Sequence, residues 1–199
     1  MTRILEITRL PRTGANFELI EYQDSLSNAG SDPLASDWGY APMPLDDNLF
    51  DRVYISHMLQ YLPWYRAVTA LRDVHRVLRP GGELEIYVPD FDALIQSYRK
   101  QICGDNWRPF NQAGGWMTWV NSRLFNCGPD ASEAIPEEGQ PWDHYKAAYD
   151  AGYLIARLTD AGFQSIECPL SERRNGPLPK VAEVAAIAIK PDETSAEPL

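Results

Sequence analysis

Residues 50–90 hold two apolar runs with a helical pattern between them, and this succession restricts the chain to few folds. Residues 53–55, Val-Tyr-Ile, are β-branched or aromatic, which predicts a short buried strand. The apolar residues within 64–78 recur every three or four positions, as on one face of an amphipathic helix. Residues 80–82, Pro-Gly-Gly, are predicted to end that helix, and the alternation in 84–88 predicts a second strand. Because strands joined through a helix run parallel, the sequence predicts a βαβ unit of an α/β sheet.

Three parts of this stretch resemble motifs of a known family. They are the Phe-Asp pair at 50–51, the Ser-His pair at 56–57 and the segment Arg-Val-Leu-Arg-Pro-Gly-Gly at 76–82. Together they resemble the fourth and fifth motifs of class I S-adenosylmethionine-dependent methyltransferases, especially the small bacterial type-11 enzymes. The likeness extends over about residues 1–190. It implies a Rossmann-like fold: a mostly parallel sheet with a C-terminal antiparallel hairpin and helices on both faces.

The chain is acidic, with a formal net charge of -10 and a pI near 4.7. Such a chain repels phosphate backbones, which argues against nucleic acid as a partner. No run approaches the ~18 apolar residues of a membrane span, so we expect no membrane association. Cys103, Cys127 and Cys168 are odd in number and widely spaced, without a metal-site pattern. We therefore expect no metal and a reduced, cytoplasmic setting, while the sequence leaves assembly into a homo- or hetero-oligomer open.

A length of 199 residues suits one domain, predicted over 1–190, with 191–199 as a disordered tail. Within the domain, residues 104–142 form an aromatic-rich insertion that we expect to act as a cap. Two interpretations of its aromatic side chains stay open: an acceptor pocket, or a satellite core beneath a long loop. The aromatic residues concerned are Trp107, Phe110, Trp116, Trp119, Phe125 and Trp142.

The C-terminal part of the chain is also predicted to hold a helix that is followed by strands. Asp150 is a good N-cap, apolar residues follow at helical spacing, and Gly162 is predicted to end the helix. Residues 164–169 and 181–189 are predicted strands, the second a continuous apolar run typical of a buried strand. In the resembled family these two strands form an antiparallel hairpin.

Residues 3–7 and 17–22 are predicted to be the first two strands. The resemblance implies a glycine-rich loop after the first of them, because only glycine lets backbone approach a cofactor closely. Here Gly14 is the lone glycine of that segment, and a lone glycine is more often a turn residue than a cofactor loop. S-adenosylmethionine is the cofactor implied. By the resemblance, it would lie near Thr8, Glu21, Asp24, Leu45 and Ser56. Glu21 and Asp24 are equally well interpreted as solvated carboxylates at a strand end.

Two histidines are candidates for a general base, since imidazole titrates near neutral pH. His57 ends the strand of residues 53–55, where parallel sheets bind ligands; the alternative is a histidine bonded to a backbone carbonyl. His144 precedes the last helix, and the alternative is a loop histidine that fixes this corner. His75 lies beside the apolar face of the predicted helix and favours a satisfied structural role. Asp90 follows a strand end, where helix capping is favoured over a role in the cleft.

The sequence leaves two principal functions open, one an enzyme and the other a binding protein. The first is a methyltransferase that transfers a methyl group from S-adenosylmethionine to a small-molecule or glycan acceptor. The second is a catalytically inactive protein of the same fold that serves as a binding or scaffold subunit, because the usual glycines are missing. A third, another nucleotide in the same crevice, is disfavoured by the lack of a phosphate-cradling loop.

Overall fold

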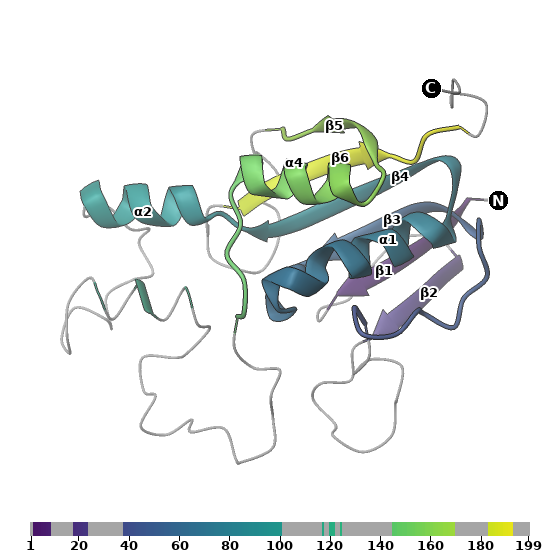
Figure 1. Ribbon diagram of the computed structural model, residues 1–199, viewed down its shortest axis with the longest axis horizontal. Coiled ribbons are helices and arrows are strands. Elements are labelled where there is room, and N and C mark those ends of the chain that lie inside the picture. Colours follow the sequence, from purple (N-terminus) through teal and green to yellow (C-terminus); the bar gives the residue numbers. More distant parts are fainter. Residues whose placement is uncertain are drawn as a thin grey trace, which may run out of the picture.

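The structure is a computed structural model (Figure 1), and its strands form a single sheet in the order β2-β1-β3-β4-β6-β5. It describes residues 2–8, 18–23 (backbone only), 38–100, 117, 120, 121, 124, 145–169 and 183–192. The strands are β1 (Arg3–Thr8), β2 (Glu18–Gln23), β3 (Phe50–Ser56), β4 (Leu78–Pro89), β5 (Gln164–Glu167) and β6 (Glu183–Ile189). The helices are η1 (Leu59–Tyr61), η2 (Trp64–Arg66), α1 (Ala67–Val77), α2 (Phe91–Lys100) and α4 (Ala151–Asp160).

The sheet is parallel from β2 to β4 and antiparallel at its C-terminal end. β1 pairs in parallel with β2 and β3, and β3 pairs in parallel with β4. β6 runs antiparallel to β4 and to β5. This arrangement confirms the predicted α/β class, with a mostly parallel sheet closed by an antiparallel hairpin.

The predicted crossover from β3 through α1 to β4 is present, but its helix ends sooner than expected. α1 stops at Val77, and Leu78 is already extended with φ -71° and ψ 143°. The Pro-Gly-Gly segment therefore lies inside the start of β4 and does not form the helix exit. Its glycines are needed there: Gly81 has φ +72°, and a Cβ on Gly82 would lie 2.7 Å from the backbone oxygen of Arg79. The segment turns the chain into the sheet, next to an irregular register between β3 and β4.

One face of the sheet is apolar and is covered by helices. α1 and α4 contact each other, so they lie on the same face, as Figure 1 shows. The helices that cover the sheet within the described residues are α1 and α4, and the prediction of helices on the other face as well is not tested by these residues. Asp150 caps α4 as predicted, because its carboxylate accepts a hydrogen bond from the Tyr153 N–H. The fully buried residues of the layer include Leu5, Ile7, Val53, Ile55, Leu71, Val74, Leu84, Ile86, Leu154 and Leu158.

The opposite face of the sheet carries polar side chains that are nonetheless buried. Glu6, Tyr54 and Glu85 are partners in register across β1, β3 and β4. Glu6 and Glu85 are only 3% and 2% exposed. The Glu85 carboxylate accepts a hydrogen bond from the Tyr87 hydroxyl at 2.5 Å and pairs with Arg52 at 3.2 Å. This ion pair and hydrogen bond compensate for the burial of Glu85.

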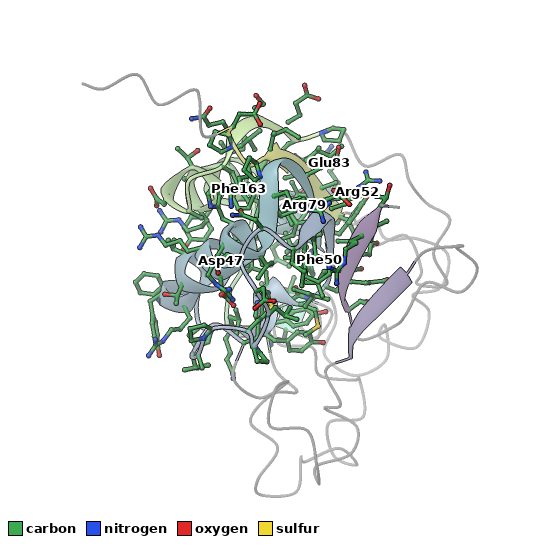
Figure 2. All side chains as sticks on the ribbon, turned by 90° about the vertical axis from the view of Figure 1, so that its right-hand side faces the viewer. Asp47, Phe50, Arg52, Arg79, Glu83 and Phe163 are labelled. Atoms are coloured by element: carbon green, nitrogen blue, oxygen red, sulfur yellow. The ribbon has the colours of Figure 1, made fainter. Side chains whose placement is uncertain are left out.

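Arg52 also forms an ion pair with Glu83. Figure 2 shows these two residues side by side, at a distance from Asp47 and Phe163.

α2 begins at the predicted place and projects beyond the end of the sheet (Figure 1). The Asp90 carboxylate accepts hydrogen bonds from the N–H groups of Asp92 and Ala93, at 2.9 and 3.3 Å, so the predicted cap is confirmed. None of the residues of α2 is buried, although their spacing is amphipathic. Among the described helices, none has the length and apolar character that a bilayer crossing requires.

The Phe-Asp pair at the start of β3 ties three parts of the chain together. The Asp51 carboxylate accepts a hydrogen bond from the Arg3 N–H at 2.7 Å and from Arg79 Nη1 at 2.6 Å. The hydrogen bond from Arg3 is the main reason why the pKa of Asp51 lies below its usual value, and Arg79 adds to the effect. The contacts join β1, β3 and the start of β4 at the amino edge of the sheet.

We predict that Asp51 makes the protein sensitive to acid. A carboxylate with a lowered folded-state pKa stabilises the fold above its ordinary pKa of about 3.9, and that stabilisation is lost as the pH falls through the folded value. The Asp51→Asn variant should therefore lose less stability than the wild type between neutral pH and roughly pH 3. Urea unfolding at both pH values measures this difference. An equal acid-induced loss in both proteins would contradict the prediction.

Candidate functional site

The carboxyl ends of the parallel strands meet at one edge of the sheet and place residues with hydroxyl groups together. Thr8, Ser56 and Tyr87 are partners in register across β1, β3 and β4. Thr8 also pairs with Gln23 of β2, while Glu183 opens the antiparallel β6 opposite Pro89. Ligands of open parallel sheets bind at this edge. The structure thus brings together two of the predicted cofactor residues, Thr8 and Ser56, whose role in binding stays a prediction.

Leu45 does not join this group. Its carbonyl oxygen accepts a hydrogen bond from Arg76 Nη1 at 2.6 Å, in the last turn of α1. That turn leads directly into the start of β4, at the amino edge of the sheet. The side chain of Glu21 and the whole of Asp24 and His144 lie outside the described residues, so their predicted roles stay predictions.

His57 occupies a constrained position directly beyond the end of β3. Its backbone is left-handed, with φ +53°, and its N–H donates to the Tyr87 carbonyl at 2.9 Å. The ring nitrogen Nδ1 lies 3.1 Å from Ser56 Oγ, and Nε2 lies 3.2 Å from Glu183 Oε1. Both ring contacts are therefore with side chains, unlike the alternative of a bond to a backbone carbonyl. Left-handed non-glycine residues cost free energy and cluster at functional sites.

Glu183 was missed as a site residue by the sequence analysis. It is more than one hundred residues from His57 along the chain, and nothing in its neighbourhood marks it. The available signal was topological: an antiparallel last strand begins at the edge where the parallel strands end. With Glu183 included, the edge offers an imidazole, a carboxylate and hydroxyl groups, which is a set able to accept and pass a proton.

The segment that precedes α4 reaches the same edge. The N–H groups of Lys146 and Ala147 both donate to the carbonyl oxygen of Gln60 in η1, at 2.7 and 3.2 Å. The rings of Tyr61 and Tyr145 meet edge to face at 5.0 Å. Burial lowers the pKa of Lys146. These contacts place the residues that follow His144 beside the turn that follows His57.

The side-chain amide of Gln60, next to this segment, is buried without hydrogen bonds to the described residues. The residue is 1% exposed, and neither Nε2 nor Oε1 has a hydrogen-bond partner among the described residues. A buried amide without partners costs about 1–3 kcal/mol.

We expect the Gln60→Met variant to unfold with a free energy about 1–3 kcal/mol higher than the wild type, because the unsatisfied amide is removed while the side-chain volume is nearly kept. Urea unfolding measures the change. Gln164→Met, at an exposed position of β5, is the matched control and should change stability by less than about 0.5 kcal/mol. Destabilisation by Gln60→Met would show that the amide is bonded in solution.

His75 has a structural position, as predicted, but it is not fully satisfied. Its ring packs edge to face on Phe163, with centroids 5.1 Å apart, and within the part of the chain that the structure describes its Nε2 has no hydrogen-bond partner. Burial lowers the pKa of His75 and therefore favours the neutral ring. The residue belongs to the packing between α1 and the end of α4, not to the carboxyl edge of the sheet.

The sequence matches a known family over part of its length. Residues 22–86 match the family model of the methyltransferase domain, Methyltransf_11. The predicted resemblance to S-adenosylmethionine-dependent methyltransferases is confirmed. The match covers β3, α1 and most of β4, and it supports S-adenosylmethionine as the cofactor.

Two curated relatives have similar sequences over part of the chain. Demethylmenaquinone methyltransferase of Staphylococcus epidermidis is 31% identical over 90 residues, which are 42% of this chain and 36% of the relative. The uncharacterized protein YafE of Escherichia coli is 30% identical over 112 residues, or 52% of each chain. The chain thus spans about a third to a half of the length of the curated relatives it matches.

Among solved structures, the S-adenosylmethionine-dependent methyltransferase SibL in its apo form is similar, with a TM-score of 0.45 and 15% identity. That similarity covers 79% of this chain and 35% of SibL.

Proposed function

We propose that the protein is a methyltransferase that transfers a methyl group from S-adenosylmethionine to a small-molecule or glycan acceptor. The observation that supports this most is the group formed by Ser56, His57 and Glu183 at the carboxyl edge of a sheet whose central crossover matches a methyltransferase domain. We further propose a cytoplasmic location and no nucleic-acid partner, in keeping with the net charge of -10.

The described residues fit the amino-acid end of the cofactor. S-adenosylmethionine carries an ammonium, a carboxylate and a positively charged sulfur, and it supplies the methyl group when bound. The hydroxyls of Thr8 and Ser56 can hydrogen-bond to such groups. Thr8 and Ser56 are adjacent in register, as a small polar ligand end requires. Glu21 and Asp24 are proposed to bind the ribose.

The chain itself would supply alignment and a base. Holding the acceptor oxygen in line with the methyl group can contribute about 7–11 kcal/mol to the rate. His57 is proposed to take the acceptor proton, and His144, which precedes the segment bonded to Gln60, is the other candidate. The aromatic residues of 104–142 are proposed to contact the acceptor.

Isothermal titration calorimetry with S-adenosylmethionine and S-adenosylhomocysteine tests the proposal. We expect saturable binding of both in the micromolar range. A panel of phenols, quinols and monosaccharides, followed by mass-spectrometric detection of S-adenosylhomocysteine, then tests transfer. Absence of binding heat at millimolar cofactor would contradict the proposed function.

The second candidate is a protein of this fold that binds a partner without catalysis. Its specific support is the link between β1 and β2. Residues 9–17, nine in number, join two parallel strands and contain a single glycine, Gly14. Parallel strands are usually joined by a dozen or more residues, commonly through a helix. Absence of cofactor binding, together with co-purification of a defined partner, would favour this candidate.

A further inference from the structure

We propose that Glu183 is a positioning residue that fixes the tautomer of His57, and that Ser56 relays the acceptor proton to the His57 ring. The inference rests on the proposed methyl transfer for its chemistry, but its structural part concerns this chain alone. The His57 ring contacts the other two side chains, one through each nitrogen: Ser56 Oγ lies 3.1 Å from His57 Nδ1, and His57 Nε2 lies 3.2 Å from Glu183 Oε1.

The carboxylate decides which ring nitrogen carries the proton. An ionised carboxylate accepts hydrogen bonds and cannot donate, so the Nε2 atom that faces Glu183 must carry the hydrogen. In the neutral ring, Nδ1 is then the acceptor, and the neighbouring Ser56 hydroxyl is the group that can donate to it. The serine oxygen keeps its lone pairs for another donor, such as an acceptor hydroxyl. The side chains of His57 and Glu183 are 20% and 19% exposed, so solvent screens the pair only in part.

Three strands, β3, β4 and β6, hold the side chains of Ser56, His57 and Glu183 in place. Ser56 ends β3, in register with Tyr87 of β4. The N–H of His57 donates to the Tyr87 carbonyl, which holds the left-handed backbone at φ +53°. Glu183 begins β6 and is fixed by its pairing with Pro89. A costly backbone conformation that turns the imidazole between a hydroxyl and a carboxylate is expected where pre-organisation serves function.

The proton transfer balances with the proposed reaction. The acceptor oxygen forms a bond to the methyl carbon, while the carbon–sulfur bond breaks and its electron pair stays on sulfur. The acceptor proton passes to Ser56 Oγ as the original Ser56 proton passes to His57 Nδ1. The resulting imidazolium is stabilised by the Glu183 carboxylate. The products are the methylated acceptor, S-adenosylhomocysteine and a protonated His57, which returns its proton to solvent.

Nitrogen-15 NMR of the ring nitrogens tests the tautomer without any acceptor. The chain has three histidines, and loss of one signal set in His57→Asn assigns His57. In the neutral wild type we expect a protonated Nε2 and an unprotonated Nδ1. In Glu183→Ala we expect averaged signals from both tautomers. Glu167→Ala, an exposed glutamate of the neighbouring β5, is the control and should leave the His57 signals unchanged.

A His57 that carries its proton on Nδ1, or whose signals are the same in wild type and Glu183→Ala, would overturn the proposal. This outcome is independent of cofactor binding, so failure of the proposed function would be seen separately in the calorimetric titration. Where transfer is detected, Glu183→Ala should lower kcat about 10-fold or more with an unchanged KM for S-adenosylmethionine, whereas an equal effect on both parameters would indicate loss of binding.

Discussion

Replacing His57 by asparagine should slow methyl transfer by about 10²- to 10⁴-fold, which is the usual contribution of a positioned general base. That loss corresponds to about 3–5 kcal/mol of transition-state stabilisation. The physical reason is that asparagine cannot take up a proton, whereas the imidazole between Ser56 and Glu183 can. Asparagine suits this position because it adopts a left-handed backbone more readily than most residues, and φ here is +53°.

The measurement is the rate of S-adenosylhomocysteine formation with an acceptor from the panel of phenols, quinols and monosaccharides. Two controls separate chemistry from folding. The variant should bind S-adenosylmethionine as the wild type does, and Thr69→Ala, at an exposed position of α1, should transfer methyl groups at the wild-type rate. A His57→Asn variant within threefold of the wild-type rate would exclude His57 as the base and turn attention to His144.

The part of the fold that could be predicted is the part with a strong local pattern. The parallel pair β3 and β4 and the helix between them follow from apolar periodicity, and Asp150 and Gly162 mark the ends of α4 as expected. The Pro-Gly-Gly segment was assigned to the wrong element because a helix exit and a strand entry use the same residues. A left-handed Gly81 is compatible with both, and only the pairing of Leu78 with Phe50 decides for the strand.

The burial of the polar face of the sheet could not be predicted either, because it also depends on how the strands pair. Glu85 alternates with apolar residues, as a solvent-facing residue of a half-buried strand does, yet it is 2% exposed. Its burial depends on Arg52 and Tyr87, and the Arg52 contact lies across a strand pair that sequence alone does not fix in register.

The candidate site could be predicted only where its residues adjoin a recognisable strand end. Ser56 and His57 follow the apolar run of β3, so the rule for parallel sheets points to them directly. Glu183 reaches the same edge through an antiparallel strand, and its position depends on the register between β6 and β4. Leu45 was predicted from its motif, and hydrogen bonding to Arg76 places it at the other edge. Local patterns predict strand tips, whereas long-range register decides which of them meet.

A second large effect is expected in the helical layer, where Leu154→Ala should reduce the free energy of unfolding by about 2–5 kcal/mol. Leu154 is 0% exposed and belongs to the core between α4 and the sheet. The substitution removes buried methyl groups and leaves a cavity that neighbouring side chains can only partly fill. Total stabilities of domains are about 5–15 kcal/mol, so the loss would be a large fraction of the whole.

The next residue of α4 provides a closely matched control. Ile155 has the same number of side-chain carbons on the same helix, but it is 37% exposed. Ile155→Ala should change the free energy of unfolding by less than about 1 kcal/mol, because little buried area is lost and alanine favours helices. Urea unfolding of both variants measures the difference. Equal losses would mean that α4 does not pack on the sheet through its Leu154 face, and the layer that supports β6, and with it Glu183, would have to be placed differently.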